Sequence, residues 1–219
     1  MSEKKSISKE DMRLYAVTDR TWLQGRSLAE VVEEALQGGV TFLQLREKTL
    51  TEEMFLQEAR IIKEIAAKYH VPFVINDNVG IAKAVDADGV HVGQGDMELM
   101  EARRILGPDK IIGVSAHNVQ EAVLAEQNGA DYLGVGAFHD TSTKKDTHVV
   151  TKETYRAIRE AVSIPIVAIG GISRGNIREL EGYGVDGAAV VSAVFASENI
   201  RDACRELRSC ILEIAACEK

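Results

Sequence analysis

Apolar runs and helical patterns alternate along the chain. Each unit begins with a short β-branched run, continues through a turn, and ends in a segment whose apolar positions recur at helical spacing. In the segment 27–39, Ser27 followed three residues later by Glu30 predicts a capping box at the helix start, and Gly38 and Gly39 predict its end. The apolar runs predict eight β-strands, at 14–18, 41–46, 72–76, 88–92, 110–115, 131–136, 165–170 and 186–192.

Strands that alternate with helices imply parallel pairing with right-handed crossovers. With 219 residues, the chain has the usual size of a (β/α)₈ barrel. The pattern therefore predicts an α/β protein with one TIM-barrel domain at 13–219, preceded by a flexible polar segment at 1–12. A doubly wound open sheet is the alternative, but no G-x-G-x-x-G follows the first strand.

The second predicted strand carries polar residues on one face. The run 41–48 alternates two leucines with Gln44, Arg46 and Lys48, and successive side chains of a strand leave opposite faces. We expect the leucines to pack against helices. The three polar side chains should point to the mouth of the barrel, where they would meet water or an anion.

Composition and charge narrow the classes of partner. The net charge of −8 and the lack of a basic stripe argue against nucleic-acid binding. No stretch approaches the roughly 20 apolar residues that cross a bilayer, and 1–12 has no apolar core typical of a signal peptide. We therefore expect a soluble, cytoplasmic protein without a membrane partner. The sequence leaves the oligomeric state open, a homo-oligomer included.

Unusual polar residues gather where the predicted strands end. In a barrel the carboxyl ends of all strands meet at one mouth, where active sites are built. The convergence of several loops on this mouth is better support than any single motif. The candidates, in chain order, are Arg46, Lys48, Asn76, Asp77, Gln94, Asp96, Ser115, the loop 139–148, Gly171 and Ser192.

The last three loops of this set predict phosphate binding. Gly171 lies in a glycine turn after the seventh strand, and a helix predicted to begin near Ser192 would offer free N–H groups. Thr141, Thr143 and Lys144 add hydroxyl and ammonium donors. The glycine turn alone could be a plain strand-to-helix connection, and the loop alone a solvated surface segment. Together they favour phosphate.

Two carboxylates predict a cation site. Asp77 and Asp96 follow adjacent strands, and oxygen ligands near a phosphate suit Mg²⁺. Either residue alone is more typical of a turn or a helix cap. Beside Arg46 and Lys48, a metal–diphosphate site becomes the better interpretation. No His/Cys cluster has the spacing of a zinc site.

The sequence offers no evident nucleophile or general base. The histidines form no catalytic set, no G-x-S-x-G elbow is present, and His91, within a strand, is expected to be packed or hydrogen-bonded there. The three cysteines, all after residue 200, have neither metal-site nor CxxC spacing. These features suit a reaction in which charge departs as phosphate or diphosphate and the protein stabilises the leaving anion.

Several stretches, in order, resemble the thiamine phosphate synthases (thiamine-phosphate pyrophosphorylases). They are "QLREK" (44–48), "INDN" (75–78), "DGVHVGQGD" (88–96), "IIGVSAH" (111–117), "ADYLGVG" (130–136), "TSTKKD" (141–146), "IPIVAIGGI" (164–172) and "VDGAAVVSAV" (185–194). One stretch departs from the family pattern. At 136–141 the chain reads Gly-Ala-Phe-His-Asp-Thr and lacks two prolines that the family often has, which predicts a less pre-ordered loop.

The resemblance implies a TIM barrel that joins 4-amino-2-methyl-5-hydroxymethylpyrimidine diphosphate to 4-methyl-5-(2-phosphoethyl)thiazole. Diphosphate leaves first, in a dissociative, Mg²⁺-assisted step, and the thiazole nitrogen then attacks the pyrimidine-methylene cation. The thiazole nitrogen is already a neutral nucleophile, which agrees with the missing base. The products are thiamine phosphate and diphosphate.

The resemblance also implies a role for each matching residue. Lys48, Ser115 and Lys144 would be the catalytic residues, and Asp77 and Asp96 the Mg²⁺ ligands. Gln44 would contact the pyrimidine. The diphosphate would be held by Arg46, Lys48, Asn76, Ser115 and Lys144, and the thiazole phosphate by Thr141, Thr143, Gly171, Val191 and Ser192.

Two other functions stay open at this point. A thiazole tautomerase-like barrel would bind thiazole phosphate without joining it to a pyrimidine, and it would need no diphosphate clamp. A non-catalytic thiamine phosphate binder would hold product without turnover. Lys48, Asp77, Asp96 and Lys144 together favour the synthase. The sequence does not say whether a partner kinase acts with it.

Overall fold

The eight predicted strands form a closed parallel barrel in the computed structural model, which describes residues 7–140 and 149–217. Each strand pairs with the next along the chain, and the barrel closes where Tyr15 of the first strand pairs with Ala189 of the last. The TIM-barrel prediction is confirmed and the open sheet is excluded. The strands are β1 (Leu14–Val17), β2 (Phe42–Leu45), β3 (Phe73–Asn76), β4 (Gly89–Val92), β5 (Ile111–Ala116), β6 (Tyr132–Gly136), β7 (Ile166–Ile169) and β8 (Gly187–Val190).

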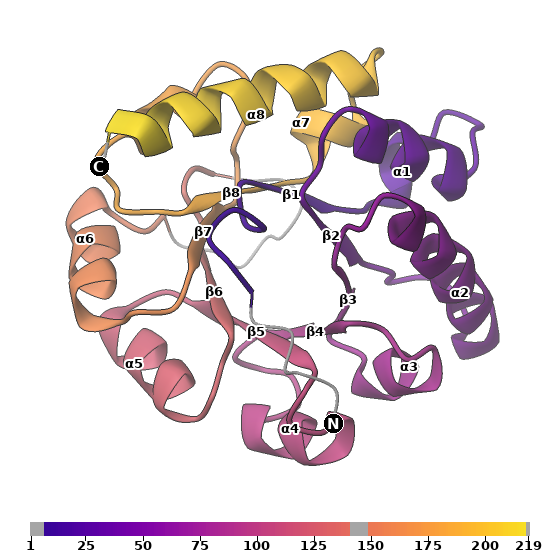
Figure 1. The fold of residues 1–219 in the computed structure, drawn as a ribbon, viewed down its shortest axis with the longest axis horizontal. Helices are drawn as coiled ribbons and strands as arrows, with labels where there is room; N and C mark the ends of the chain where they lie inside the picture. Colours follow the sequence, from indigo (N-terminus) through magenta and orange to yellow (C-terminus); the bar gives the residue numbers. More distant parts are fainter. Residues whose placement is uncertain (1–6, 141–148, 218–219) are drawn as a thin grey trace.

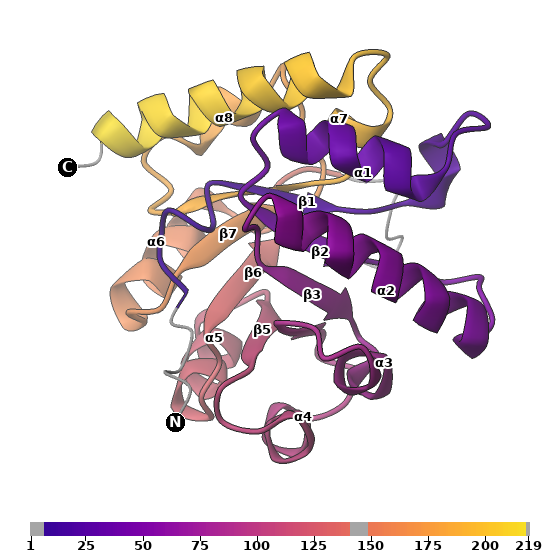
Figure 2. The ribbon, with the colours of Figure 1, turned by 45° about the vertical axis from the view of Figure 1, so that its right-hand side comes forward.

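Helices surround the barrel on its outside (Figure 1). They are α1 (Leu28–Gln37), α2 (Glu52–Lys68), α3 (Val79–Ala84), α4 (Leu99–Leu106), α5 (Val119–Gln127), α6 (Lys152–Ala161), α7 (Ser192–Phe195) and α8 (Ile200–Cys217), with 3₁₀ turns η1 (Arg20–Trp22) and η2 (Ile177–Leu180). Helix α8 lies beside α1 in both ribbon views (Figures 1 and 2). No helix among the described residues is long and apolar enough to cross a membrane.

Local signals place α1 as predicted. The Ser27 hydroxyl accepts from the Glu30 N–H while the Glu30 carboxylate accepts from the Ser27 N–H, so the capping box is present. Gly38 ends the helix, and a Cβ there would lie 2.6 Å from the Cβ of Cys204 on α8. Glycine thus allows α1 and α8 to pack closely, and the buried Cys204 is a packing residue of that contact.

The alternation of β2 separates two apolar layers. Leu43 and Leu45 are fully buried in the layer between barrel and helices, as predicted from their spacing. Phe42 points into the barrel, where its ring lies edge-on to Tyr15 at a centroid distance of 4.6 Å and to Tyr132 at 5.4 Å. This aromatic cluster fills the barrel interior, so the barrel is a packed core and not a pore.

The segment before β1 closes the end of the barrel where the strands begin, which is its floor. Met12 is fully buried in the same inner cluster, and β8 donates from the Ala188 N–H to the Arg13 carbonyl at 3.2 Å. Lys9 forms an ion pair with Asp186 at 2.9 Å. The domain boundary at residue 12 stays a prediction, but the part of 1–12 that is described, 7–12, packs against the barrel floor.

Candidate active site

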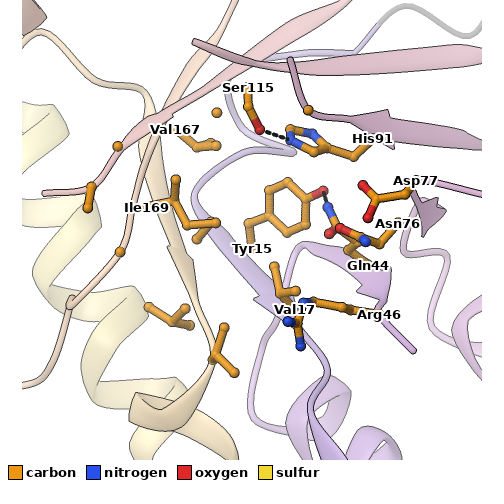
Figure 3. A pocket seen from close by; sticks show the side chains of 18 of the residues that line it. Tyr15, Val17, Gln44, Arg46, Asn76, Asp77, His91, Ser115, Val167 and Ile169 are labelled. Atoms are coloured by element: carbon orange, nitrogen blue, oxygen red, sulfur yellow. Dashed lines mark hydrogen bonds between the residues drawn. The ribbon is translucent and has the colours of Figure 1, made fainter. Parts of the chain in front are cut away.

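A cavity of about 480 Å³ opens at the carboxyl ends of the strands. Its walls contain every predicted site residue that the structure describes. These residues are Gln44, Arg46, Lys48, Asn76, Asp77, Asp96, Ser115, Gly171, Val191 and Ser192. Thr141, Thr143 and Lys144 lie outside the described residues. Figure 3 shows the side chains of Gln44, Arg46, Asn76, Asp77 and Ser115 around one space.

The loop after β2 presents its two cations to the cavity and hides the acid between them. The Glu47 carboxylate, only 2 % exposed, accepts from Arg20 Nε at 2.6 Å. Burial raises the pKa of Glu47, and the Arg20 guanidinium acts against that rise. With Glu47 anchored outside, Arg46 and Lys48 are left on the cavity side. Arg46 is steadied there by Asp19, at 3.0 Å.

The predicted strand at 41–46 extends one residue beyond β2 at each end. Strand β2 ends at Leu45 because the Arg46 N–H donates to the hydroxyl of Thr18, at 2.9 Å, and not to a strand neighbour. Arg46 and Lys48 therefore reach the cavity from a loop, although the alternation predicted their direction correctly.

Asp77 and Asp96 both line the cavity, from the loops after β3 and β4. Lys48 Nζ lies 2.7 Å from Asp77 Oδ2, so a cation already reaches this carboxylate from the cavity side. Asp96 Oδ2 accepts from the Gly93 N–H at 2.8 Å. The described residues contain no cluster of three or more His, Cys, Asp or Glu side chains that would form a protein-only metal cage. Two carboxylates that leave room for water and substrate oxygens fit the donor set of Mg²⁺.

A chain of buried hydrogen bonds crosses the floor of the cavity. Gln44 Nε2 donates to the Tyr15 hydroxyl at 2.5 Å, and the Tyr15 and Tyr132 hydroxyls are 2.7 Å apart. His91 Nδ1 lies 3.0 Å from the Tyr132 hydroxyl, and its Nε2 lies 3.0 Å from Ser115 Oγ. The first and last of these contacts are drawn in Figure 3. The expectation that His91 is hydrogen-bonded within its strand is confirmed.

The loops after β7 and β8 form another wall of the cavity. Gly171 has a φ of +67°, and a Cβ there would meet the Asp140 carbonyl at 2.7 Å, so only glycine fits. The predicted helix start at Ser192 is confirmed, with Val191 as the residue before α7. In the departing stretch, Phe138 and His139 donate their N–H groups to Ile169 and Gly170 at 2.9 and 3.0 Å. The described part of this loop thus rests on the glycine turn.

Comparison with known proteins matches this architecture to one family. The sequence model described as thiamine monophosphate synthase matches residues 14–194. A thiamine-phosphate synthase from Clostridium tetani is 49% identical over 197 residues, which are 90% of this chain and 94% of that protein. One from Shouchella clausii is 48% identical over 202 residues, 92% of this chain and 97% of that protein.

A solved structure agrees in fold and sequence. Thiamine phosphate pyrophosphorylase from Pyrococcus furiosus superposes with a TM-score of 0.87 at 41% identity, over 94% of this chain and 98% of that chain. The chain belongs to the thiamine monophosphate synthase family. The resemblance drawn from the sequence motifs is therefore confirmed, and the chain spans nearly the whole length of these relatives.

Sequence reasoning missed several side chains that this member of the synthase family brings to its cavity. Tyr15 and Val17 line it from β1. Gln94, expected at this mouth from its place after the fourth strand, also lines the cavity and donates to the Ser115 carbonyl at 2.6 Å. The alternation of β1 carried the signal, because Tyr15 and Val17 share its inward face. Tyr132 lies below the cavity and could be found only from its contacts.

Proposed function

We propose that this cavity joins a pyrimidine diphosphate to a thiazole phosphate, giving thiamine phosphate and diphosphate. Because the chain belongs to the synthase family, it is an enzyme of the transferase class. One observation supports the specific reaction most strongly. Two cations, Arg46 and Lys48, and two carboxylates, Asp77 and Asp96, line the same cavity at the barrel mouth. A diphosphate with its metal needs both kinds of group.

The reaction begins with loss of the leaving group. The bond between the pyrimidine methylene carbon and the diphosphate oxygen breaks, and its electron pair departs with diphosphate. Arg46, Lys48, Asn76 and Ser115, joined by Lys144, are the proposed groups that stabilise this anion by charge and by donated hydrogen bonds. The ring amino group stabilises the remaining cation, with Gln44 as the proposed pyrimidine contact.

The second step forms the new bond. The thiazole nitrogen donates its lone pair to the methylene carbon, and no proton moves at the reacting atoms. Gly171, Val191 and Ser192, with Thr141 and Thr143, are the proposed contacts of the thiazole phosphate. This arrangement holds the nitrogen on the side of the cavity opposite the departing diphosphate, where it can capture the cation.

The metal of this family is proposed here to be Mg²⁺, held by Asp77 and Asp96. When bound, Mg²⁺ would neutralise part of the diphosphate charge. Lys48 now pairs with Asp77, so we expect Lys48 to turn to the diphosphate when a metal takes its place beside the carboxylate. A cytoplasmic location, the absence of nucleic-acid and membrane partners, and a homo-oligomeric state stay predictions.

A single assay separates the three candidate functions. Both substrates are mixed with the enzyme and Mg²⁺, and diphosphate and thiamine phosphate are followed together. A synthase releases both products in equal amounts. A tautomerase-like barrel would change the thiazole without releasing diphosphate, and a non-catalytic binder would show only binding. Either of the last two results would contradict the proposed function.

Replacing Asp77 should change the metal requirement. In Asp77→Ala we expect the Mg²⁺ concentration that gives half of the maximal rate to rise about tenfold, since one of two carboxylate ligands is lost. The matched control is Asp86→Ala. Asp86 also has a positive φ and also pairs with a lysine, Lys110 at 2.6 Å, but it lies outside the cavity. Metal titrations that coincide for the two variants would remove Asp77 from the site.

A further inference from the structure

The hydrogen-bond chain below the cavity joins two residues that the proposed function uses, Gln44 and Ser115. Three others, Tyr15, Tyr132 and His91, complete it. We propose that this chain fixes the direction of hydrogen-bond donation, so that the Ser115 hydroxyl is held as a donor toward the leaving diphosphate. Tyr132 and His91 are then positioning residues. The inference rests on the proposed function for the identity of the anion.

The direction of hydrogen-bond donation follows from Gln44, at one end of the chain. Gln44 is buried, with 3 % of its surface exposed, and its Nε2 donates to the Tyr15 oxygen at 2.5 Å. A phenol hydroxyl has one proton. Because its oxygen already accepts from Gln44, Tyr15 directs that proton to the Tyr132 oxygen, 2.7 Å away. The amide oxygen of Gln44 is left as an acceptor, which suits the amino group of a pyrimidine.

Both tyrosines keep the proton that this direction requires. Tyr15 and Tyr132 are fully buried, and burial raises the pKa of each hydroxyl above its ordinary value. The hydrogen bonds that Tyr15 shares with Tyr132 and Gln44 lower its pKa, but they do not cancel the rise caused by burial. At neutral pH both groups are therefore phenols that can donate, not phenolates that only accept.

His91 accepts a hydrogen bond at one ring nitrogen and donates one from the other. Tyr132 accepts from Tyr15, so its own proton goes to His91 Nδ1, at 3.0 Å. In a neutral imidazole one nitrogen accepts and the other donates. Acceptance at Nδ1 places the ring proton on Nε2, which donates to Ser115 Oγ at 3.0 Å. The tautomer of His91 is thereby determined by the two tyrosines.

The result is a serine hydroxyl with a defined role. Ser115 Oγ accepts from His91, so its own proton is available to a group in the cavity that it lines. Phosphate oxygens near neutral pH act as acceptors, and they can use Ser115 only as a donor. In the reverse direction Ser115 would donate to His91 and would offer a diphosphate only a lone pair.

The tautomer of His91 is directly measurable without activity. We expect ¹⁵N NMR of protein labelled in its five histidines to show a protonated Nε2 and an unprotonated Nδ1 for His91. The signals are assigned by their loss in His91→Gln. A proton on Nδ1, in either the neutral or the charged ring, would overturn the inference. This readout stands even if the wild-type enzyme releases no diphosphate, which would contradict the proposed function instead.

A double-mutant cycle tests the role in catalysis. We expect Tyr132→Phe to slow single-turnover diphosphate release about tenfold, in line with a lost hydrogen bond to a charged group. In the Ser115→Ala background the same change should have almost no further effect, because the serine it orients is absent. Equal slowing in both backgrounds would contradict the inference, as would an unchanged rate in Tyr132→Phe.

The matched control is Tyr155→Phe. Tyr155 is fully buried and donates to the Val135 carbonyl at 2.6 Å, but it does not line the cavity. Both Phe variants lose one buried hydroxyl, so both should lower the urea midpoint of unfolding. Only Tyr132→Phe should lower the rate. Equal slowing in the two variants would show a general structural effect and would overturn the positioning role.

Discussion

The Lys48→Ala variant should lose most of its rate of diphosphate release while remaining folded. Lys48 lines the cavity with its side chain 53 % exposed, so removing the side chain leaves no buried void. A charge-assisted contact to a leaving anion commonly contributes about 2–4 kcal/mol to transition-state stabilisation, or roughly 30- to 1,000-fold in rate. The loss should fall on kcat, because the anion carries its full charge only as the bond breaks.

Steady-state kinetics with both substrates and saturating Mg²⁺ measure this effect. The control is Lys68→Ala, which removes the same charge from an exposed position at the end of α2. It corrects for the change in net charge. A Lys48→Ala enzyme with a rate close to that of Lys68→Ala would mean that the diphosphate lies elsewhere.

Closure of the barrel leaves no room for a side chain at Gly187. A Cβ added at Gly187, the first residue of β8, would overlap the Met12 carbonyl oxygen and lie 2.5 Å from the carbonyl carbon. Both of these Met12 atoms belong to the backbone, so rotation of a side chain cannot relieve the overlap. We expect Gly187→Ala to lower the free energy of unfolding by about 3 kcal/mol, and the melting temperature by roughly 10 °C.

Urea unfolding followed by circular dichroism measures the change, as a shift of the midpoint at constant slope. Gly175→Ala is the control. Gly175 is exposed, and the nearest atom to a new Cβ would be 3.7 Å away. If the two variants unfolded at the same urea concentration, the segment before β1 would not seal the barrel against β8 as described.

Local patterns predicted the strands and the directions of their side chains. In 41–48, alternation alone separated the leucines that face the helices from Gln44, Arg46 and Lys48, which line the cavity. The capping box of α1 and the start of α7 at Ser192 were also predicted correctly. These features depend on neighbouring residues and on the shared direction of parallel strands, and both can be found in a sequence.

Contacts between distant strands could not be predicted in this way. Tyr15 and Tyr132 are 117 residues apart, and only closure of the barrel brings their hydroxyls together. The same holds for the pairing of Lys48 with Asp77, which the sequence assigned to separate ligands. The early end of β2 depends on the hydroxyl of Thr18, which directly follows β1. Such details follow from three-dimensional packing and not from periodicity.

A crystal structure with Mg²⁺, thiamine phosphate and diphosphate bound together tests the central claim most directly. We expect diphosphate in the cavity, in contact with Arg46, Lys48 and Ser115, and a metal between it and the carboxylates of Asp77 and Asp96. We also expect the ester phosphate of the product beside Gly171 and Ser192. Diphosphate bound away from Lys48 and Asp77 would contradict the claim that these groups assemble to draw it from carbon.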